Sequence, residues 1–80
     1  MTETKEPQLL PGHKWVRASE LKGGNKLLFL ADDGKVHHET LSHVDVARWI
    51  KTDEGYCEWL HFKGGGDMVA SKSDEFQVKL

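Results

Sequence analysis

The stretch Ala47–Lys63, ARWIKTDEGYCEWLHFK, decides the fold of this 80-residue chain. It contains two runs rich in apolar residues, and Asp53-Glu54-Gly55 separates them. Asp and Glu suit the two central positions of a type I turn, and glycine readily takes the positive φ that the following position requires. The stretch is therefore predicted to form a β-hairpin with a three-residue loop and a bulge.

Counting outward from this turn pairs Thr52 with Tyr56 and sets Trp49 opposite Trp59. Because successive side chains of a strand point to opposite faces, one face of the hairpin carries Ala47, Trp49, Lys51, Cys57, Trp59 and His61. The other face carries Val46, Arg48, Ile50, Tyr56, Glu58, Leu60 and Phe62. Both faces are more apolar than a strand pair with a single buried face requires. We expect the tryptophan-bearing face to be partly exposed and to bind a partner, and we expect the core to contain Ile50, Leu60 and Phe62.

The rest of the chain repeats this pattern of short apolar runs and turn residues. Lys26–Thr40 reads as a second hairpin that turns at Asp32-Asp33-Gly34, and Phe76–Leu80 alternates with a period of two. These features predict a mainly β fold, a small antiparallel open barrel or meander of about five to seven short strands. The alternative is an α+β fold with one short helix at about 42–51, where Ser42 and Asp45 could form a capping box.

Composition indicates one small domain. The chain has 38% hydrophobic residues, 30% charged residues and a formal net charge of −2, which fits a globular protein and is not the basic balance of a nucleic-acid binder. Residues 1–12 are polar and end in Pro11-Gly12, so we expect a flexible N-terminal tail followed by a single domain over residues 13–80. The single cysteine, Cys57, suits the reducing cytoplasm. No apolar run resembles a signal peptide or a membrane span.

The sequence contains no recognisable catalytic, cofactor or metal motif, so we predict a protein that is not an enzyme and needs neither cofactor nor metal. Cys57 and His61 are four residues apart on one strand, too far for a hydrogen bond between nucleophile and base. Zinc needs several convergent nitrogen or sulfur ligands, whereas the neighbouring His37 and His38 point to opposite faces of a strand. Gly64–Gly66 lacks the Gly-Lys-Ser/Thr ending of a phosphate-binding loop.

One segment is similar to a known family. His13–Leu28 contains Trp15-Val16 followed by Glu20-Leu21-Lys22-Gly23-Gly24-Asn25, and it resembles the segment that precedes a hairpin in Hint/intein-type self-splicing domains. The resemblance covers about a fifth of the chain and implies strands around Trp15 and Leu28. Asn25 stands where those domains usually have Asp, and the chain has no N-terminal Cys or Ser and no terminal His-Asn pair. The resemblance therefore does not extend to splicing activity.

The aromatic-rich face of the first hairpin is the feature closest to a function. Because tryptophan and tyrosine are enriched in protein-binding hot spots, we predict that another protein binds through Trp49, Lys51, Trp59 and His61. A short, near-neutral domain without a catalytic motif fits an accessory protein of a phage or other mobile element that occludes a host defence complex. A second copy of the chain is a further expected partner, and a membrane is not. The alternative is a small nucleic-acid-binding β-barrel that stacks bases on its aromatic rings.

Overall fold

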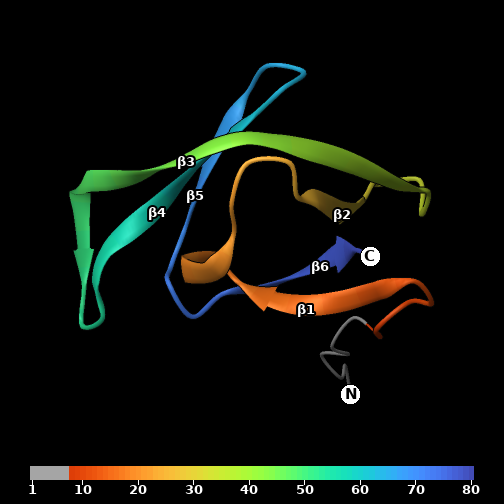
Figure 1. Cartoon of the computed structure of the whole chain (residues 1–80), viewed down its shortest axis with the longest axis horizontal. Helices are drawn as coiled ribbons and strands as arrows, with labels where there is room; N and C mark the ends of the chain where they lie inside the picture. The colour runs from red at the N-terminus through yellow and green to blue at the C-terminus, as the bar shows by residue number, and fades with distance from the viewer. Residues whose placement is uncertain (1–7) are drawn as a thin grey trace.

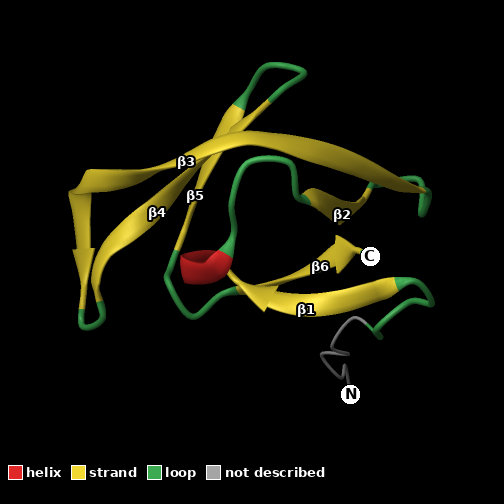
Figure 2. Ribbon diagram, viewed as in Figure 1, coloured by secondary structure: helices red, strands yellow, loops and turns green. Residues whose placement is uncertain are grey.

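The structure is a computed structural model that describes residues 8–80, in which six strands form one open antiparallel sheet (Figure 1, Figure 2). The strand order is β1-β6-β2-β3-β4-β5, so the middle of the chain forms a meander while the first and last strands pair with each other. The elements are β1 (His13–Arg17), the 3₁₀ turn η1 (Ala18–Glu20), β2 (Lys26–Leu30), β3 (Val36–Thr52), β4 (Gly55–Phe62), β5 (Asp67–Ala70) and β6 (Glu75–Lys79). The predicted mainly β fold with an open sheet is confirmed.

The long strand β3 shows that the alternative of a helix at 42–51 is wrong. Val44 and Val46 alternate with polar side chains, and β-branched residues favour a strand over a helix. The first part of β3, Val36–Thr40, pairs with β2, and the part from Leu41 onward pairs with β4. One strand therefore connects the two halves of the sheet. Within residues 8–80, no helix is long and apolar enough to cross a membrane.

A glycine loop marks the point where β3 changes its partner. The Gly24 N–H donates to the Leu41 carbonyl at 2.8 Å, and the Leu41 N–H donates to the Asn25 carbonyl at 2.8 Å. A Cβ atom on Gly23 would lie 2.5 Å from the backbone oxygen of Ser42, which is closer than two such atoms approach. Ser42 is the extra residue of a bulge in β3. The loop can therefore reach this bulge only because residue 23 has no side chain.

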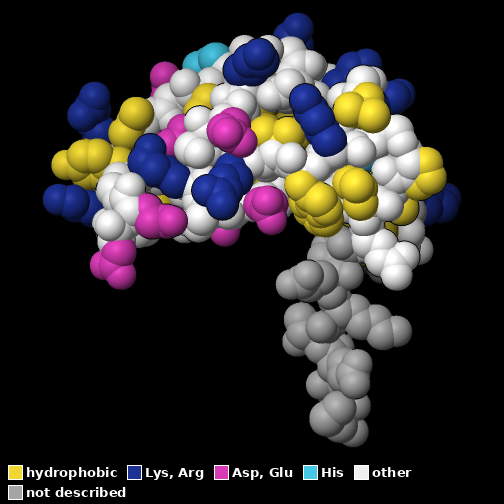
Figure 3. All heavy atoms as spheres, turned by 60° about the horizontal axis from the view of Figure 1, so that its bottom comes forward, with side chains coloured by type: hydrophobic (Ala, Val, Ile, Leu, Met, Phe, Trp, Pro, Cys, Tyr) yellow, Lys and Arg dark blue, Asp and Glu magenta, His cyan; other side chains and the backbone are white. Residues whose placement is uncertain are grey.

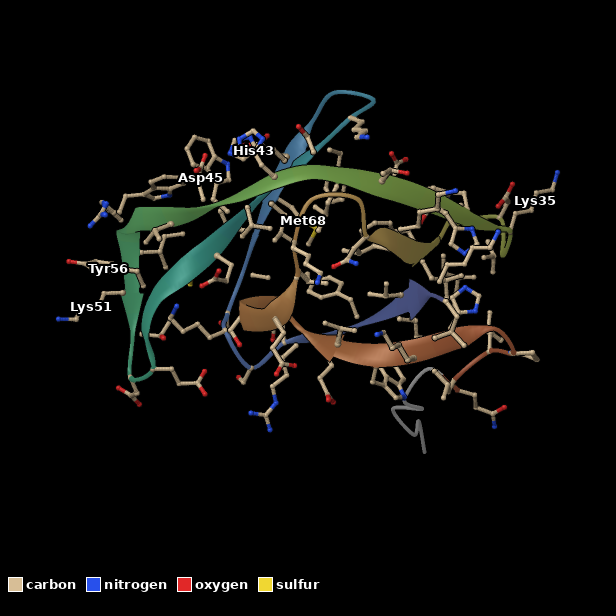
Figure 4. All side chains as sticks on the ribbon, viewed as in Figure 1. Lys35, His43, Asp45, Lys51, Tyr56 and Met68 are labelled. Carbon is tan, nitrogen blue, oxygen red and sulfur yellow. The ribbon has the colours of Figure 1, made fainter. Side chains whose placement is uncertain are left out.

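The core lies inside the curved sheet, between β3 and the pair of β1 and β6 (Figure 1). Its buried side chains are Ala18, Leu21, Leu27, Leu41, Leu60, Ala70 and Val78. Met68 packs against this cluster and lies beneath β3 in Figure 4. Of the three hairpin residues expected in the core, Leu60 is fully buried and Phe62 packs against the cluster. The expectation for Ile50 is wrong, because this residue is 37% exposed.

The N-terminal part of the described chain is attached to β6. The Leu10 N–H donates to the side-chain oxygen of Gln77, and the Gln77 amide donates to the Gln8 carbonyl, both at 2.8 Å. The Leu80 N–H donates to the Gly12 carbonyl at 2.8 Å. The bonds to Leu10 and Gln8 satisfy the side-chain amide of Gln77, which is almost fully buried. The expected flexible tail over 1–12 includes residues 1–7, which lie outside the described residues, and its mobility stays a prediction.

Candidate functional site

The hairpin between β3 and β4 has a tighter turn than predicted and a different register. Thr52 pairs with Gly55, so the loop has two residues, and Lys51 pairs with Tyr56. The Thr52 hydroxyl closes the turn by donating to the Gly55 carbonyl at 2.9 Å and accepting from the Glu54 N–H at 3.1 Å. The positive φ of Gly55, +106°, is therefore used at the first position of β4.

A large bulge in β3 precedes the turn and changes which residues lie opposite one another. Ala47 pairs with Cys57 and Lys51 pairs with Tyr56, so residues 48–50 of β3 have no partner on β4. The predicted backbone pairing of Trp49 with Trp59 is wrong, since Asp45 lies opposite Trp59. Bulges commonly redirect a side chain, and β3 bends sharply toward its end in Figure 1.

The two tryptophans nevertheless touch. The rings of Trp49 and Trp59 meet edge to face with centroids 4.9 Å apart and an interplanar angle of 86°, a favourable aromatic geometry. Trp49 is 61% exposed, although a tryptophan usually buries most of its surface. Ala47 and Cys57 share the face of Trp59 by strand alternation and are buried outside the main core cluster. The outer side of the hairpin thus has a small apolar cluster of its own, with Trp49 exposed on it.

Two histidines extend this cluster along the outer face. The ring of His61 lies 4.3 Å from that of Trp59, and His43 stacks on His61 at 4.3 Å with an interplanar angle of 10°. This places His43, from β3, beside His61, its cross-strand partner on β4. We refer to Trp49, Trp59, His61 and His43 as the aromatic row.

Two carboxylates border the aromatic row. Asp45 Oδ2 lies 3.1 Å from His61 Nε2 and 3.3 Å from His43 Nε2. Asp67 of β5 accepts a hydrogen bond from the indole N–H of Trp59. Figure 4 shows His43 and Asp45 projecting from the outer side of β3, away from the core. The row therefore combines apolar rings with negative charge.

Lys51 does not join the other residues predicted for the partner site. Its Nζ atom lies 5.9 Å from the ring centroid of Tyr56, a cation–π contact. Both side chains project from the bent end of the hairpin in Figure 4, apart from His43 and Asp45. The structure thus brings together three of the four predicted residues, Trp49, Trp59 and His61.

A second exposed apolar surface lies at the opposite end of the molecule. An apolar groove of about 380 Å³ is lined by side chains that include Trp15, Leu28, Leu30, Val36 and Phe76. Leu30 is 72% exposed. Hydrophobic side chains gather on the right of Figure 3, at the end where β1 and β2 lie in Figure 1. The sequence offered one signal for this surface, the run Leu27–Leu30, which is apolar on both faces of its strand.

A second pair of histidines connects β1 with β3. The Nε2 atoms of His13 and His38 are 2.8 Å apart, and their rings stack with centroids at 5.1 Å. A hydrogen bond between two imidazoles needs one ring to be a neutral acceptor. Desolvation of the ring, followed by repulsion from charges on His13, Lys79, Lys26 and His37, lowers the pKa of His38 below its ordinary value. The pair therefore favours a neutral His38.

One buried acidic group of the hairpin has a structural partner. Glu58 is almost fully buried and accepts a hydrogen bond from Lys72 Nζ at 2.7 Å. Cys57 is 4% exposed.

Comparison of the chain with known proteins found no matching family model, no matching curated protein and no matching solved structure.

Proposed function

We propose that this protein is a binding domain that contacts another protein through the aromatic row, with Trp49 as the anchor. One observation carries the proposal: a tryptophan at a large bulge is 61% exposed while its ring meets the ring of Trp59 edge to face. Protein-binding hot spots are enriched in tryptophan, and a ring already held by a neighbour loses little conformational freedom on binding. The bulge supports this role because it presents the indole outward from an otherwise paired strand.

The charges around the row favour a protein partner over a nucleic acid. Asp45 and Asp67 lie beside Trp59 and His61, where a base-stacking surface would have lysine or arginine to hold the phosphates. The formal net charge of the chain is −2. A partner with an apolar pocket bordered by basic side chains fits these features, because its pocket would cover Trp49 and its charges would face the two carboxylates.

The small size of the domain supports a function by occlusion. A chain of 80 residues that presents an exposed aromatic anchor can block a surface of a larger complex without chemistry of its own. We propose that the partner belongs to a host complex, such as a defence complex, and that the protein is an accessory product of a phage or other mobile element. A second copy of this chain is the other partner that the aromatic row could bind.

The test compares two tryptophans that occupy different surfaces. Tagged wild-type protein, Trp49→Ala and Trp15→Ala are used to capture proteins from a bacterial lysate, and the bound proteins are quantified by mass spectrometry. Trp15 is a matched control because it is 39% exposed and lines the apolar groove. We expect a partner that Trp49→Ala loses and Trp15→Ala retains. With the purified partner, the substitution of Trp49 should weaken binding by about 2 kcal/mol or more, roughly thirtyfold.

Three outcomes would contradict the proposal of a host protein bound at the aromatic row. Loss of the partner with Trp15→Ala alone would show that the partner binds at the apolar groove. A steep decrease of affinity with rising salt concentration, together with captured nucleic acid, would favour the nucleic-acid alternative. Self-association of the wild type in sedimentation experiments, abolished by Trp49→Ala, would show that the partner is a second copy.

A further inference from the structure

We propose that His43, Asp45 and His61 form a binding site for a divalent first-row transition-metal ion such as Zn²⁺. Each residue offers one ligand atom, and the three atoms lie within 4.8 Å of one another. Asp45 Oδ2 lies 3.3 Å from His43 Nε2 and 3.1 Å from His61 Nε2. The site lies on the outer face of β3 and β4, and it does not depend on the proposed partner.

These separations match the dimensions of a metal site. Zinc binds imidazole nitrogen and carboxylate oxygen at about 2.0–2.2 Å, so two ligand atoms of a tetrahedral site lie about 3.3–3.6 Å apart. The two measured nitrogen-to-oxygen separations are at or slightly below this range. A small outward movement of Asp45, whose side chain is 52% exposed, would leave space for the ion. The backbone already provides the convergence, because His43 and His61 are cross-strand partners.

His61 supplies an independent observation that points to a ligand. Its Nε2 atom is buried and has no hydrogen-bond partner within residues 8–80. The Asp45 carboxylate oxygen is only 3.1 Å away, but the two atoms do not form a hydrogen bond. Buried polar atoms are nearly always paired. A bound cation would pair this nitrogen and the Asp45 oxygen at the same time.

The donor set selects the class of ion. Two imidazoles and one carboxylate suit first-row transition metals such as Zn²⁺, whereas Ca²⁺ and Mg²⁺ prefer oxygen ligands. The rings of His43 and His61 are stacked, so binding requires them to tilt until one nitrogen of each ring points at the ion. The side chain of His43 is 56% exposed and can make this movement. Three protein ligands leave a fourth position for water or a ligand from another molecule.

The sequence does not indicate this site, because His43 and His61 lie on different strands and only the register of β3 and β4 brings them together. Asp45 contributes the third ligand from the same face of β3 as His43, since they are two residues apart. His13 and His38 form the other close pair of histidines. Within residues 8–80, no carboxylate joins this pair to make a comparable group of three ligands. This second pair serves as the control.

The experiment measures metal binding to the intact protein after treatment with a chelator. Zn²⁺ is titrated by calorimetry, and Co²⁺ or Cu²⁺ is followed by quenching of tryptophan fluorescence, because Trp59 lies 4.3 Å from His61. We expect one zinc ion per chain and a higher melting temperature in its presence. His43→Ala and Asp45→Asn should weaken binding at least about a hundredfold, since loss of an outer-sphere partner alone costs 10–100-fold. His38→Ala should bind as the wild type does.

The variants separate this proposal from its competitors. His61 is partly buried, so His43→Ala and Asp45→Asn, which change exposed side chains, are the primary variants, and far-UV circular dichroism checks their folding. Trp49→Ala should retain zinc, which distinguishes the metal site from the proposed partner site. The absence of stoichiometric binding would overturn the proposal. Binding that survives His43→Ala and is lost with His38→Ala would also overturn it, because the ion would then occupy the other histidine pair.

Discussion

Leu60→Ala and Ile50→Ala test the register of the β3–β4 hairpin. Leucine and isoleucine are isomers, so each substitution removes three carbon atoms. A difference between their costs therefore reports the surroundings of the two side chains. Leu60 is fully buried in the core, whereas Ile50 lies in the bulge and is 37% exposed. The simple alternation of the sequence places both residues on one buried face.

The expected costs differ by a factor of about two or more. Leu60→Ala should lower the free energy of unfolding by about 3–4 kcal/mol, because a cavity remains in addition to the lost burial. For Ile50, three carbons at about 0.8 kcal/mol each, reduced for exposure, give about 1.5 kcal/mol and no sealed cavity. A domain of this size has a stability of roughly 4–12 kcal/mol. Ile50→Ala should therefore stay folded, whereas Leu60→Ala should retain little stability if the wild type lies at the lower end of this range.

Urea unfolding, followed by far-UV circular dichroism, measures both costs. With a slope of about 1 kcal/mol/M, the midpoint should shift by roughly 1.5 M for Ile50→Ala and by about twice as much for Leu60→Ala. Equal shifts, or a larger shift for Ile50→Ala, would refute the bulge and restore the pairing of Trp49 with Trp59. If Leu60→Ala does not fold at all, the small cost of Ile50→Ala still decides between the two registers.

Three further perturbations test the contacts outside the aromatic row. Because the pKa of His38 is lowered in the folded state, the unfolded chain binds more protons, and the free energy of unfolding should decrease as the pH falls below about 6.5. Between pH 7.5 and pH 5, the urea midpoint should fall less for His38→Gln than for the wild type, and identical curves would contradict this. Lys72→Met leaves the Glu58 carboxylate buried without its cation and should cost about 1–3 kcal/mol, the lower part of the range reflecting the partial exposure of Lys72; the exposed Lys63→Met is its control. Gly23→Ala should destabilise the protein because the new methyl group would overlap the Ser42 carbonyl, and an unchanged melting temperature would show that the loop can move away.

Strand positions and turns were predictable from the sequence, but the register was not. Asp-Asp-Gly at 32–34, Asp-Glu-Gly at 53–55 and the glycines at 64–66 all lie in or beside loops, as their turn chemistry requires. Alternation cannot reveal how many residues a bulge contains, because a bulge leaves the strands on both sides of it with normal periodicity. The helix alternative at 42–51 failed for a related reason, since Ser42 resembles an N-cap and is in fact the extra residue of a bulge.

The shift in register explains which predicted site residues came together. Beyond the bulge, the observed register differs from the predicted one by four residues, an even number, so Trp59 and His61 keep the face that alternation gave them. At the turn the register differs by one residue, and an odd shift moves a side chain to the other face. Lys51 therefore pairs with Tyr56 and lies apart from the aromatic row. The same even shift places His43 opposite His61, a pairing that no sequence pattern predicted.

The pairing of β1 with β6 has a consequence for how the chain folds. Strands β2 to β5 each pair with their neighbours in sequence and can form through short loop closures, whereas β1 must wait for a strand at the far end of the described chain. Closing so long a loop carries a high entropic cost, and folds rich in distant contacts form slowly. During synthesis the meander can assemble first, with Leu27 lacking its cross-strand partner Val78. The nascent protein would then expose part of its future core until β6 leaves the ribosome.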